Sequence, residues 1–268
     1  MTSDSDDEAE AARALLGDDE PDPVELLPGA GASPFFITCD HASPRLPRAL
    51  GTLGLSPAAL ESHIAWDIGA AGVARRLATA LGATAVLQRY SRLVIDCNRP
   101  PGSDDSVVTR SEATEIPGNR GLAPSQLEAR RHAVFEPYHA RIVQALDRRA
   151  AIGLPTILIA LHSFTPVFLG VPRPWHVGVL YQRDPRLGVV VRDWLRADPA
   201  LVVGDNQPYA VDDRSDYGVI HHGERRGNLH VELELRQDLI AEPDGQGRWA
   251  DRLAEALRHA SARFPAGA

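Results

Sequence analysis

Two histidines stand at the ends of apolar runs of the sequence. Asp40 and His41 come after the run FFITC at residues 35–39, and His162 comes after the run TILIAL at residues 156–161. If both runs are parallel strands, these side chains meet at the carboxyl edge of a sheet, where open α/β sheets bind ligands. Neutral imidazole is a favoured zinc ligand, so His41 and His162 are candidate metal ligands. The alternative is that each histidine only terminates its strand.

The segment HIAWDIGA offers a third ligand. His63 and Asp67 are four positions apart in it, and they share one face if the helix is continuous. The Asp67 carboxylate and the two histidines would form a three-ligand zinc site with one position open for water. Asp67 is also suited to cap the helix that follows it, in which case the third ligand would be Asp40, His63 or a water molecule.

A polar cluster ends the segment SRLVIDCNRP, in which Arg92, Asp96, Asn98 and Arg99 lie within eight residues. A guanidinium group binds a carboxylate through two parallel hydrogen bonds, and a neighbouring amide adds a directional contact. The cluster therefore suits an acidic substrate. The alternative is a network of salt bridges on the surface.

Glu232 and Glu234 are two positions apart in the run HVELEL at residues 230–235, so they share one face of a strand. Carboxylates on an otherwise apolar strand are costly to bury unless they are paired, bound to a ligand or used in catalysis. In zinc-dependent hydrolysis one glutamate suffices as general base, because it passes a proton from water to the leaving nitrogen. The alternative is an edge strand with one polar face.

The elements that must position these residues alternate between short apolar runs and longer amphipathic ones. We expect strands at residues 35–39, 84–88, 92–98, 156–161, 176–181, 201–204 and 230–235. We expect helices after Pro57 up to Gly82, at 123–151 with a bend at Pro137, and near 186–197 and 247–263. This pattern predicts an α/β fold in a single domain, with a mixed, largely parallel sheet flanked by helices.

Composition excludes several kinds of chemistry. The 28 basic residues are all arginines, because the sequence contains no lysine. A Schiff-base nucleophile, a pyridoxal-phosphate anchor and the lysine of a phosphate-binding loop are therefore excluded. The two cysteines, Cys39 and Cys97, have neither the spacing of a structural zinc motif nor the density of a disulfide framework.

The charge is unevenly placed, because ten of the 36 acidic residues lie within residues 1–25. So acidic a segment buries too little apolar surface to fold, and we expect a disordered tail at 1–28 and one folded domain at 29–268. No apolar run reaches the roughly 18 residues of a membrane span, and a pI of 5.7 disfavours nucleic acid as a partner. We expect a cytoplasmic protein with neither a membrane nor a nucleic acid as partner.

Six segments, taken in order, resemble motifs of the N-formylglutamate amidohydrolase family: DHAS, HIAWDIGA, SRLVIDCNRP, ALHSFTP, VGDNQPY and VELELRQDLI. The resemblance extends from about Phe35 to Ile240. It implies a fold similar to that of zinc carboxypeptidases and aspartoacylases, with one divalent metal ion, expected to be zinc. It also implies hydrolysis of N-formyl-L-glutamate to formate and L-glutamate, a step of histidine degradation.

The resemblance also implies roles for individual residues. His41 and His162 match the metal-binding histidines, and Asp67 matches an acidic position that completes the set. Glu234, rather than Glu232, matches the catalytic glutamate. Asparagine and arginine positions of the family hold a substrate carboxylate, and a further histidine precedes the final strand. Asn98, Arg99 and His221 match these positions, and with Arg92 as a possible partner of the pair they form the expected substrate-binding set.

Two departures separate this chain from the pattern that it resembles. DHAS stands where the family usually has PHSG, and Pro44 occupies the last position of the H-x-x-E metal pair that would begin at His41. These departures indicate a divergent branch, for which another acidic N-acyl amino acid is an alternative substrate. Further alternatives are a zinc peptidase or deacylase of different specificity and a non-catalytic ligand-binding protein with the same fold.

Overall fold

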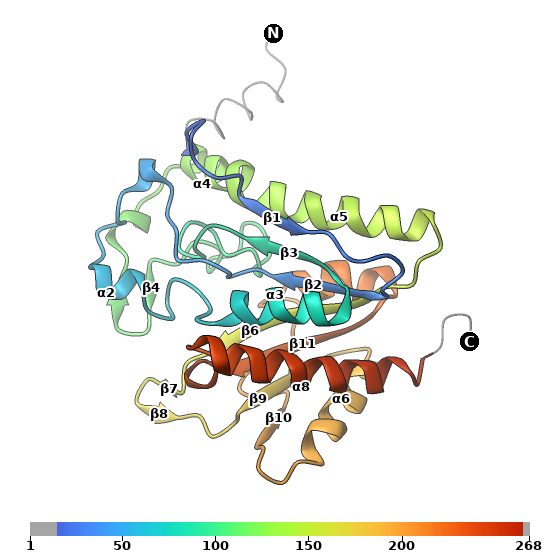
Figure 1. Ribbon diagram of the computed structural model, residues 1–268. Coiled ribbons are helices and arrows are strands. Elements are labelled where there is room, and N and C mark those ends of the chain that lie inside the picture. Colours follow the sequence, from blue (N-terminus) through green and yellow to red (C-terminus); the bar gives the residue numbers. More distant parts are fainter. Residues whose placement is uncertain (1–14, 265–268) are drawn as a thin grey trace.

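A seven-stranded mixed sheet lies at the centre of the computed structural model, which describes residues 15–264 (Figure 1). In spatial order its strands are β1 Val24–Leu27, β3 Thr84–Gln88, β2 Phe35–Cys39, β6 Ile157–Phe164, β11 Leu229–Arg236, β9 Val177–Leu180 and β10 Val203–Asp205. Strands β3, β2, β6 and β11 are parallel, whereas β1 and β9 run antiparallel to their neighbours β3 and β11. The predicted α/β fold with a mixed, largely parallel sheet is confirmed.

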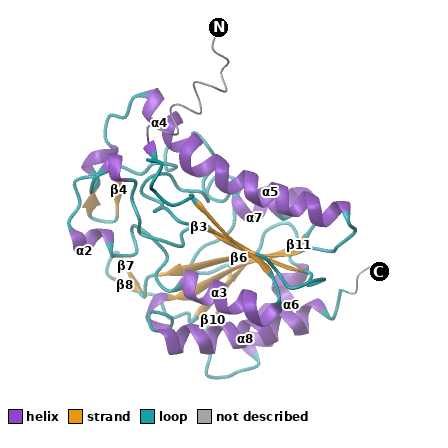
Figure 2. Ribbon diagram, turned by 45° about the horizontal axis from the view of Figure 1, so that its top comes forward, coloured by secondary structure: helices purple, strands orange, loops and turns teal. Residues whose placement is uncertain are grey.

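Helices cover both faces of the sheet (Figure 2). One face packs against α3 Ala70–Leu81, α6 Arg186–Arg196 and α8 Pro243–Ser261. The other packs against α5 Glu136–Ala151 and α7 Gly218–His222, and α5 is preceded by α4 Pro124–Arg130. The shorter elements are α2 Pro57–Leu60, β4 Arg110–Ser111, β5 Thr114–Glu115, β7 Val167–Phe168 and β8 Val171–Pro172. Among residues 15–264, no helix is both long enough and apolar enough to cross a bilayer.

The alternation of side chains along the central strands decides which residues reach the site. In β6 the odd-numbered apolar residues belong to the core under α3, α6 and α8, whereas Leu158 and Ala160 belong to the core under α5. Because residues two apart in a strand share a face, His162 lies on the α5 side of the sheet. The odd-numbered residues of β11 also face α3 and α8, which leaves Glu232 and Glu234 on the same side as His162.

Two predicted elements are wrong, and the first is the strand at 92–98. These residues form turns, because their backbone groups are bonded locally rather than in a ladder. The Val94 amide donates to the Ser91 carbonyl, and the Asp96 amide donates to the Ser106 carbonyl. The apolar side chain of Val94 is nevertheless fully buried in the core under α5. The apolar run therefore reports burial and not a strand.

The second is the continuous helix after Pro57. It is interrupted, because α2 ends at Leu60 and α3 begins only at Ala70. Gly69 precedes α3 with a φ of 81°, and a Cβ atom at this position would lie 2.2 Å from the Ile240 carbonyl oxygen. The turn therefore requires glycine, which the helical pattern did not reveal.

The long helix predicted at 123–151 is present but changes its winding. Residues Arg131–Phe135 form a π-helical segment between α4 and α5. Pro137 lies in the first turn of α5 and has no N–H to donate to the preceding turn, which accounts for the wider winding just before it. The irregularity expected at Pro137 therefore lies just before this residue.

The predicted boundary at residue 28 is also wrong, because residues 15–28 belong to the domain. Strand β1 pairs with β3 in the register Val24↔Gln88, and Leu15 and Val24 are buried. The short apolar pattern VELL covers the edge of β3, although its acidic surroundings suggested disorder. The remainder of the expected tail, residues 1–14, lies outside the described residues.

Candidate metal centre and substrate cavity

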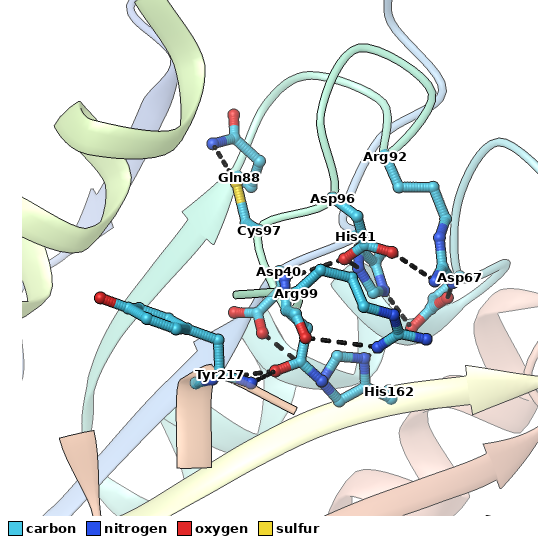
Figure 3. A network of polar contacts seen from close by, with 12 residues as sticks. Asp40, His41, Asp67, Gln88, Arg92, Asp96, Cys97, Arg99, His162 and Tyr217 are labelled. Atoms are coloured by element: carbon cyan, nitrogen blue, oxygen red, sulfur yellow. Dashed lines mark hydrogen bonds and ion pairs between the residues drawn. The ribbon is translucent and has the colours of Figure 1, made fainter. Parts of the chain in front are cut away.

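His41, Asp67 and His162 converge at the carboxyl edge of β2 and β6 (Figure 3). Asp67 Oδ2 lies 2.9 Å from His162 Nδ1 and 3.4 Å from His41 Nδ1. One ligand atom from each residue lies within 4.8 Å of the others, and all three side chains are buried. The structure therefore brings together the three residues that the sequence suggested as metal ligands.

Asp67 is a member of this cluster and not a helix cap. The N-cap of α3 is Gly69, and Asp67 Oδ2 instead accepts a hydrogen bond from the Ser163 amide at 3.2 Å. Burial opposes ionisation of Asp67, but the adjacent His41 and His162 hold the pKa of its carboxyl well below the usual value. The Asp67 carboxyl is therefore ionised at any ordinary pH.

His41 is fixed from behind by Asp96. The Nε2 atom of His41 lies 2.7 Å from Asp96 Oδ1, and the other oxygen of Asp96 accepts from Arg92 at 2.5 Å. Although burial opposes ionisation, the Arg92 guanidinium holds the pKa of Asp96 well below its usual range. An ionised partner at Nε2 leaves Nδ1 of His41 to face Asp67, an arrangement found around metal-binding histidines. Sequence reasoning grouped Asp96 with Arg92 but missed this role.

Glu232 and Glu234 line the same cavity from β11. In register, Glu234 lies opposite His162 of β6, and among the described residues Oε2 of each glutamate has no hydrogen-bond partner. Burial raises the pKa of Glu234 to about 7. Burial and the negative charge of Asp216 raise the pKa of Glu232 well above its usual range. Burial therefore raises the pKa of both carboxyl groups on this face of the strand.

Arg92 and Arg99 both line the cavity but differ in their partners. Arg92 is paired with Asp96, and its Nη1 lies 3.8 Å from Asp67 Oδ1. Arg99 forms an ion pair with the half-exposed Asp105 at 3.0 Å. Arg92 thus balances buried charge within the site, whereas the partner of Arg99 can move into solvent.

Asn98 is largely occupied by the backbone that surrounds it. Its Oδ1 accepts hydrogen bonds from the amides of Tyr217 and Gly218, at 3.1 and 2.9 Å, and its Nδ2 donates to Asp216. One N–H of this amide remains for a ligand. Its main role in the structure is to tie the loop after residue 98 to the start of α7.

Two histidines considered from the sequence lie apart from the cluster. His221 is on α7, where it stacks on Tyr217 with a centroid distance of 4.6 Å, and it is not among the residues that line the cavity. The substrate-binding role expected for His221 therefore stays a prediction without support from this geometry. His63 lines the cavity, but its Nε2 is bonded to Glu112 at 2.9 Å. It is therefore not needed as the third ligand.

The cavity above these groups has a volume of about 350 Å³. It is lined by the cluster, the two glutamates and the arginines, and also by the largely apolar side chains of Ile64, Val108, Phe164, Phe168 and Tyr209. Arg173 stacks on two of these rings, 4.5 Å from the centroid of Phe168 and 4.8 Å from that of Tyr209. A small polar molecule with an apolar portion fits such a site.

Comparisons with known proteins agree with this picture. The sequence model of the N-formylglutamate amidohydrolase family matches residues 33–241. A protein of Pseudomonas putida named N-formylglutamate deformylase is 32% identical over 246 residues, which are 84% of this chain and 88% of that protein.

Two solved structures are also similar. The structure of a gene product of Agrobacterium tumefaciens has a TM-score of 0.90 and 37% identity, and the match covers 93% of this chain and 99% of that one. The structure of N-formylglutamate amidohydrolase from Ralstonia eutropha has a TM-score of 0.69 at 18% identity, covering 90% and 98% of the two chains. At this identity the second match supports the fold alone.

Proposed function

Since the chain belongs to the N-formylglutamate amidohydrolase family, and is thus a hydrolase that acts on an amide bond, we propose that it cleaves N-formyl-L-glutamate to formate and L-glutamate with the help of a divalent metal ion. The observation that carries the proposal is the buried cluster of His41, Asp67 and His162 with Glu234 beside it. All four residues were expected from the sequence either to bind the metal or to move a proton.

The residues present suit a metal ion, and we propose zinc. Two imidazole nitrogens and one carboxylate oxygen are a donor set that catalytic zinc sites use. The separations of 2.9 and 3.4 Å from Asp67 Oδ2 are close to the roughly 3.3 Å between tetrahedral ligands at zinc bond lengths. When bound, the metal would polarise the amide carbonyl and make water a better nucleophile.

Glu234 is the proposed general base. Its pKa of about 7 allows the carboxylate to accept a proton from the attacking water and the carboxyl to return it to the leaving nitrogen. Glu232, on the same face of β11, lies opposite Ala160 in register, whereas Glu234 lies opposite His162 of the cluster. This difference favours Glu234 over Glu232.

Arg99 is the proposed anchor of a substrate carboxylate. Arg92 already forms an ion pair with Asp96 and faces Asp67, so its charge is balanced by these two carboxylates rather than by a substrate. Arg99 is paired with Asp105, whose side chain is 52% exposed, and a substrate carboxylate can replace that partner at little cost. The remaining N–H of Asn98 adds one directional contact.

A hydrolysis assay with metal-free and zinc-reconstituted protein tests the proposal. The panel contains N-formyl-L-glutamate, N-formyl-L-aspartate, N-acetyl-L-glutamate and N-formyl-L-leucine. We expect zinc-dependent formate release, fastest with N-formyl-L-glutamate. Turnover that a chelator leaves unchanged would contradict the metal dependence. Faster cleavage of N-acetyl or peptide substrates would instead indicate a deacylase or peptidase.

A further inference from the structure

We infer that Asp40 and Tyr138, which lie behind the cluster, position His162 for the proposed metal ion. The inference rests on the proposed function and extends it to two residues that do not line the cavity. Asp40 lies between the end of β2 and His41, and Tyr138 belongs to α5, the helix that packs on the same side of the sheet as His162. Both side chains are buried, with exposed fractions of 1% and 0%.

The first observation is the orientation of the His162 ring. Its Nδ1 faces Asp67 Oδ2 at 2.9 Å, so the opposite nitrogen, Nε2, points away from the proposed metal position. Nε2 lies 3.7 Å from Asp40 Oδ2, and among the described residues neither atom has a hydrogen-bond partner. If Nδ1 binds a metal, the neutral ring carries its proton on Nε2, and the nearest acceptor for that proton is Asp40.

The second observation is that Asp40 is itself fixed. The Tyr138 hydroxyl donates a hydrogen bond to Asp40 Oδ1, which leaves Oδ2 directed toward His162. Gly218 of α7 also packs close to this carboxyl group, because a Cβ atom at position 218 would lie 3.1 Å from Asp40 Oδ2. The carboxyl group therefore has little freedom to rotate away from His162.

The two histidines are thus supported in parallel ways. Asp96, held by Arg92, contacts Nε2 of His41, and Asp40, held by Tyr138, faces Nε2 of His162. Such outer partners fix the ring and make the ligating nitrogen more basic, so their loss weakens metal binding. Tyr138 acts through Asp40 and is a positioning residue.

Competition with a chromophoric chelator measures the zinc affinity of the full-length variants. Tyr138→Phe removes only the hydroxyl, and we expect its zinc dissociation constant to rise about 10- to 100-fold, with Asp40→Ala at least as strongly affected. The matched control is Tyr90→Phe, because Tyr90 is equally buried and its hydroxyl bonds to the Pro21 carbonyl at 3.0 Å. This control should lose stability but keep the zinc affinity of the wild type.

Crystal structures of the metal-free variants give a second readout. We expect Asp40 to turn away from His162 in Tyr138→Phe, and the His162 ring to be reoriented in Asp40→Ala. Unchanged zinc affinity together with an unchanged ring would overturn the inference and leave both residues structural. If the wild type bound no zinc, the proposed function would fail, whereas these structures would still decide whether Asp40 and Tyr138 position His162.

Discussion

Glutamine in place of Glu234 removes the proposed base while preserving the size of the side chain. Because Oε2 of Glu234 is buried and has no partner among the described residues, the substitution breaks no hydrogen bond at that atom. General-base catalysis contributes about two to four orders of magnitude to the rate, so kcat should fall by that factor. This corresponds to an activation barrier that is higher by about 3 to 5 kcal/mol. Zinc content should not change, since Glu234 is outside the cluster of potential ligands.

The pH profile supplies a second signature of the same residue. Burial raises the pKa of Glu234 to about 7, and only the ionised form can accept a proton. The value of kcat/KM should therefore fall about tenfold per unit as the pH drops below about 7, and level off above it. The Glu234→Gln variant should lack this acid limb, because its residual turnover no longer depends on that carboxyl.

Glu232→Gln is the matched control, from the same face of the same strand. Glu232 is not the proposed base, and glutamine keeps the size of its buried side chain. Most of the activity should remain. The reasoning is refuted if Glu234→Gln keeps near-normal turnover, if the roles of the two variants are exchanged, or if Glu234→Gln loses its metal.

Three further predictions concern specificity and stability. Arg99→Lys should raise KM for acidic substrates more than for the corresponding α-amides, since lysine keeps the charge but loses the planar two-point contact; equal changes in KM would make Arg99 structural. Deleting residues 1–28 should lower Tm by several degrees, because it removes β1 and two buried side chains that contribute roughly 1.5 to 3 kcal/mol each, whereas deletion of 1–14 spares them. Burial lowers the pKa of His139 to about 4, so below about pH 6.5 the unfolded chain binds a proton that the folded protein does not. The free energy of unfolding, measured with denaturant, should therefore fall by about 2 kcal/mol from this group between pH 7 and 5. The fall should be smaller in His139→Gln.

The sequence predicted the centre of the fold better than its edges. Strands β2 and β6 are uniformly buried, so their apolar runs are unambiguous, and the polar residues that follow them mark the carboxyl edge of the sheet. The edge strand β1 was missed because the charge of the whole N-terminal segment outweighed the four-residue, largely apolar run VELL. The apolar run at 92–98 reflects the burial of its side chains under α5, and turns can bury these side chains as well as a strand can.

In the candidate site, too, local sequence patterns indicated some residues, whereas contacts between distant parts of the chain could not be predicted. His41, His162 and the pair Glu232 and Glu234 could be proposed because they lie in or near the ends of apolar runs, whereas the choice of Glu234 came from the family resemblance. The partnership of Asp96 with His41 spans 55 positions, and that of Tyr138 with Asp40 spans 98. No periodicity encodes such pairs, because they depend on which helix crosses which strand.

In the proposed metal site, Asp67 takes the place of the acid that the H-x-x-E pattern would supply. The H-x-x-E pattern that the family resemblance suggested would supply an acid three positions after His41, but Pro44 stands there. The Asp67 amide donates to the His41 carbonyl at 2.9 Å, which binds the turn before α3 to the end of β2. This backbone contact brings an acid 26 positions away as close to His41 as a sequence neighbour would be. In this chain, the spacing of candidate ligands along the sequence is therefore a weak guide to the proposed metal site. Their position at the carboxyl edge of the sheet is a stronger guide.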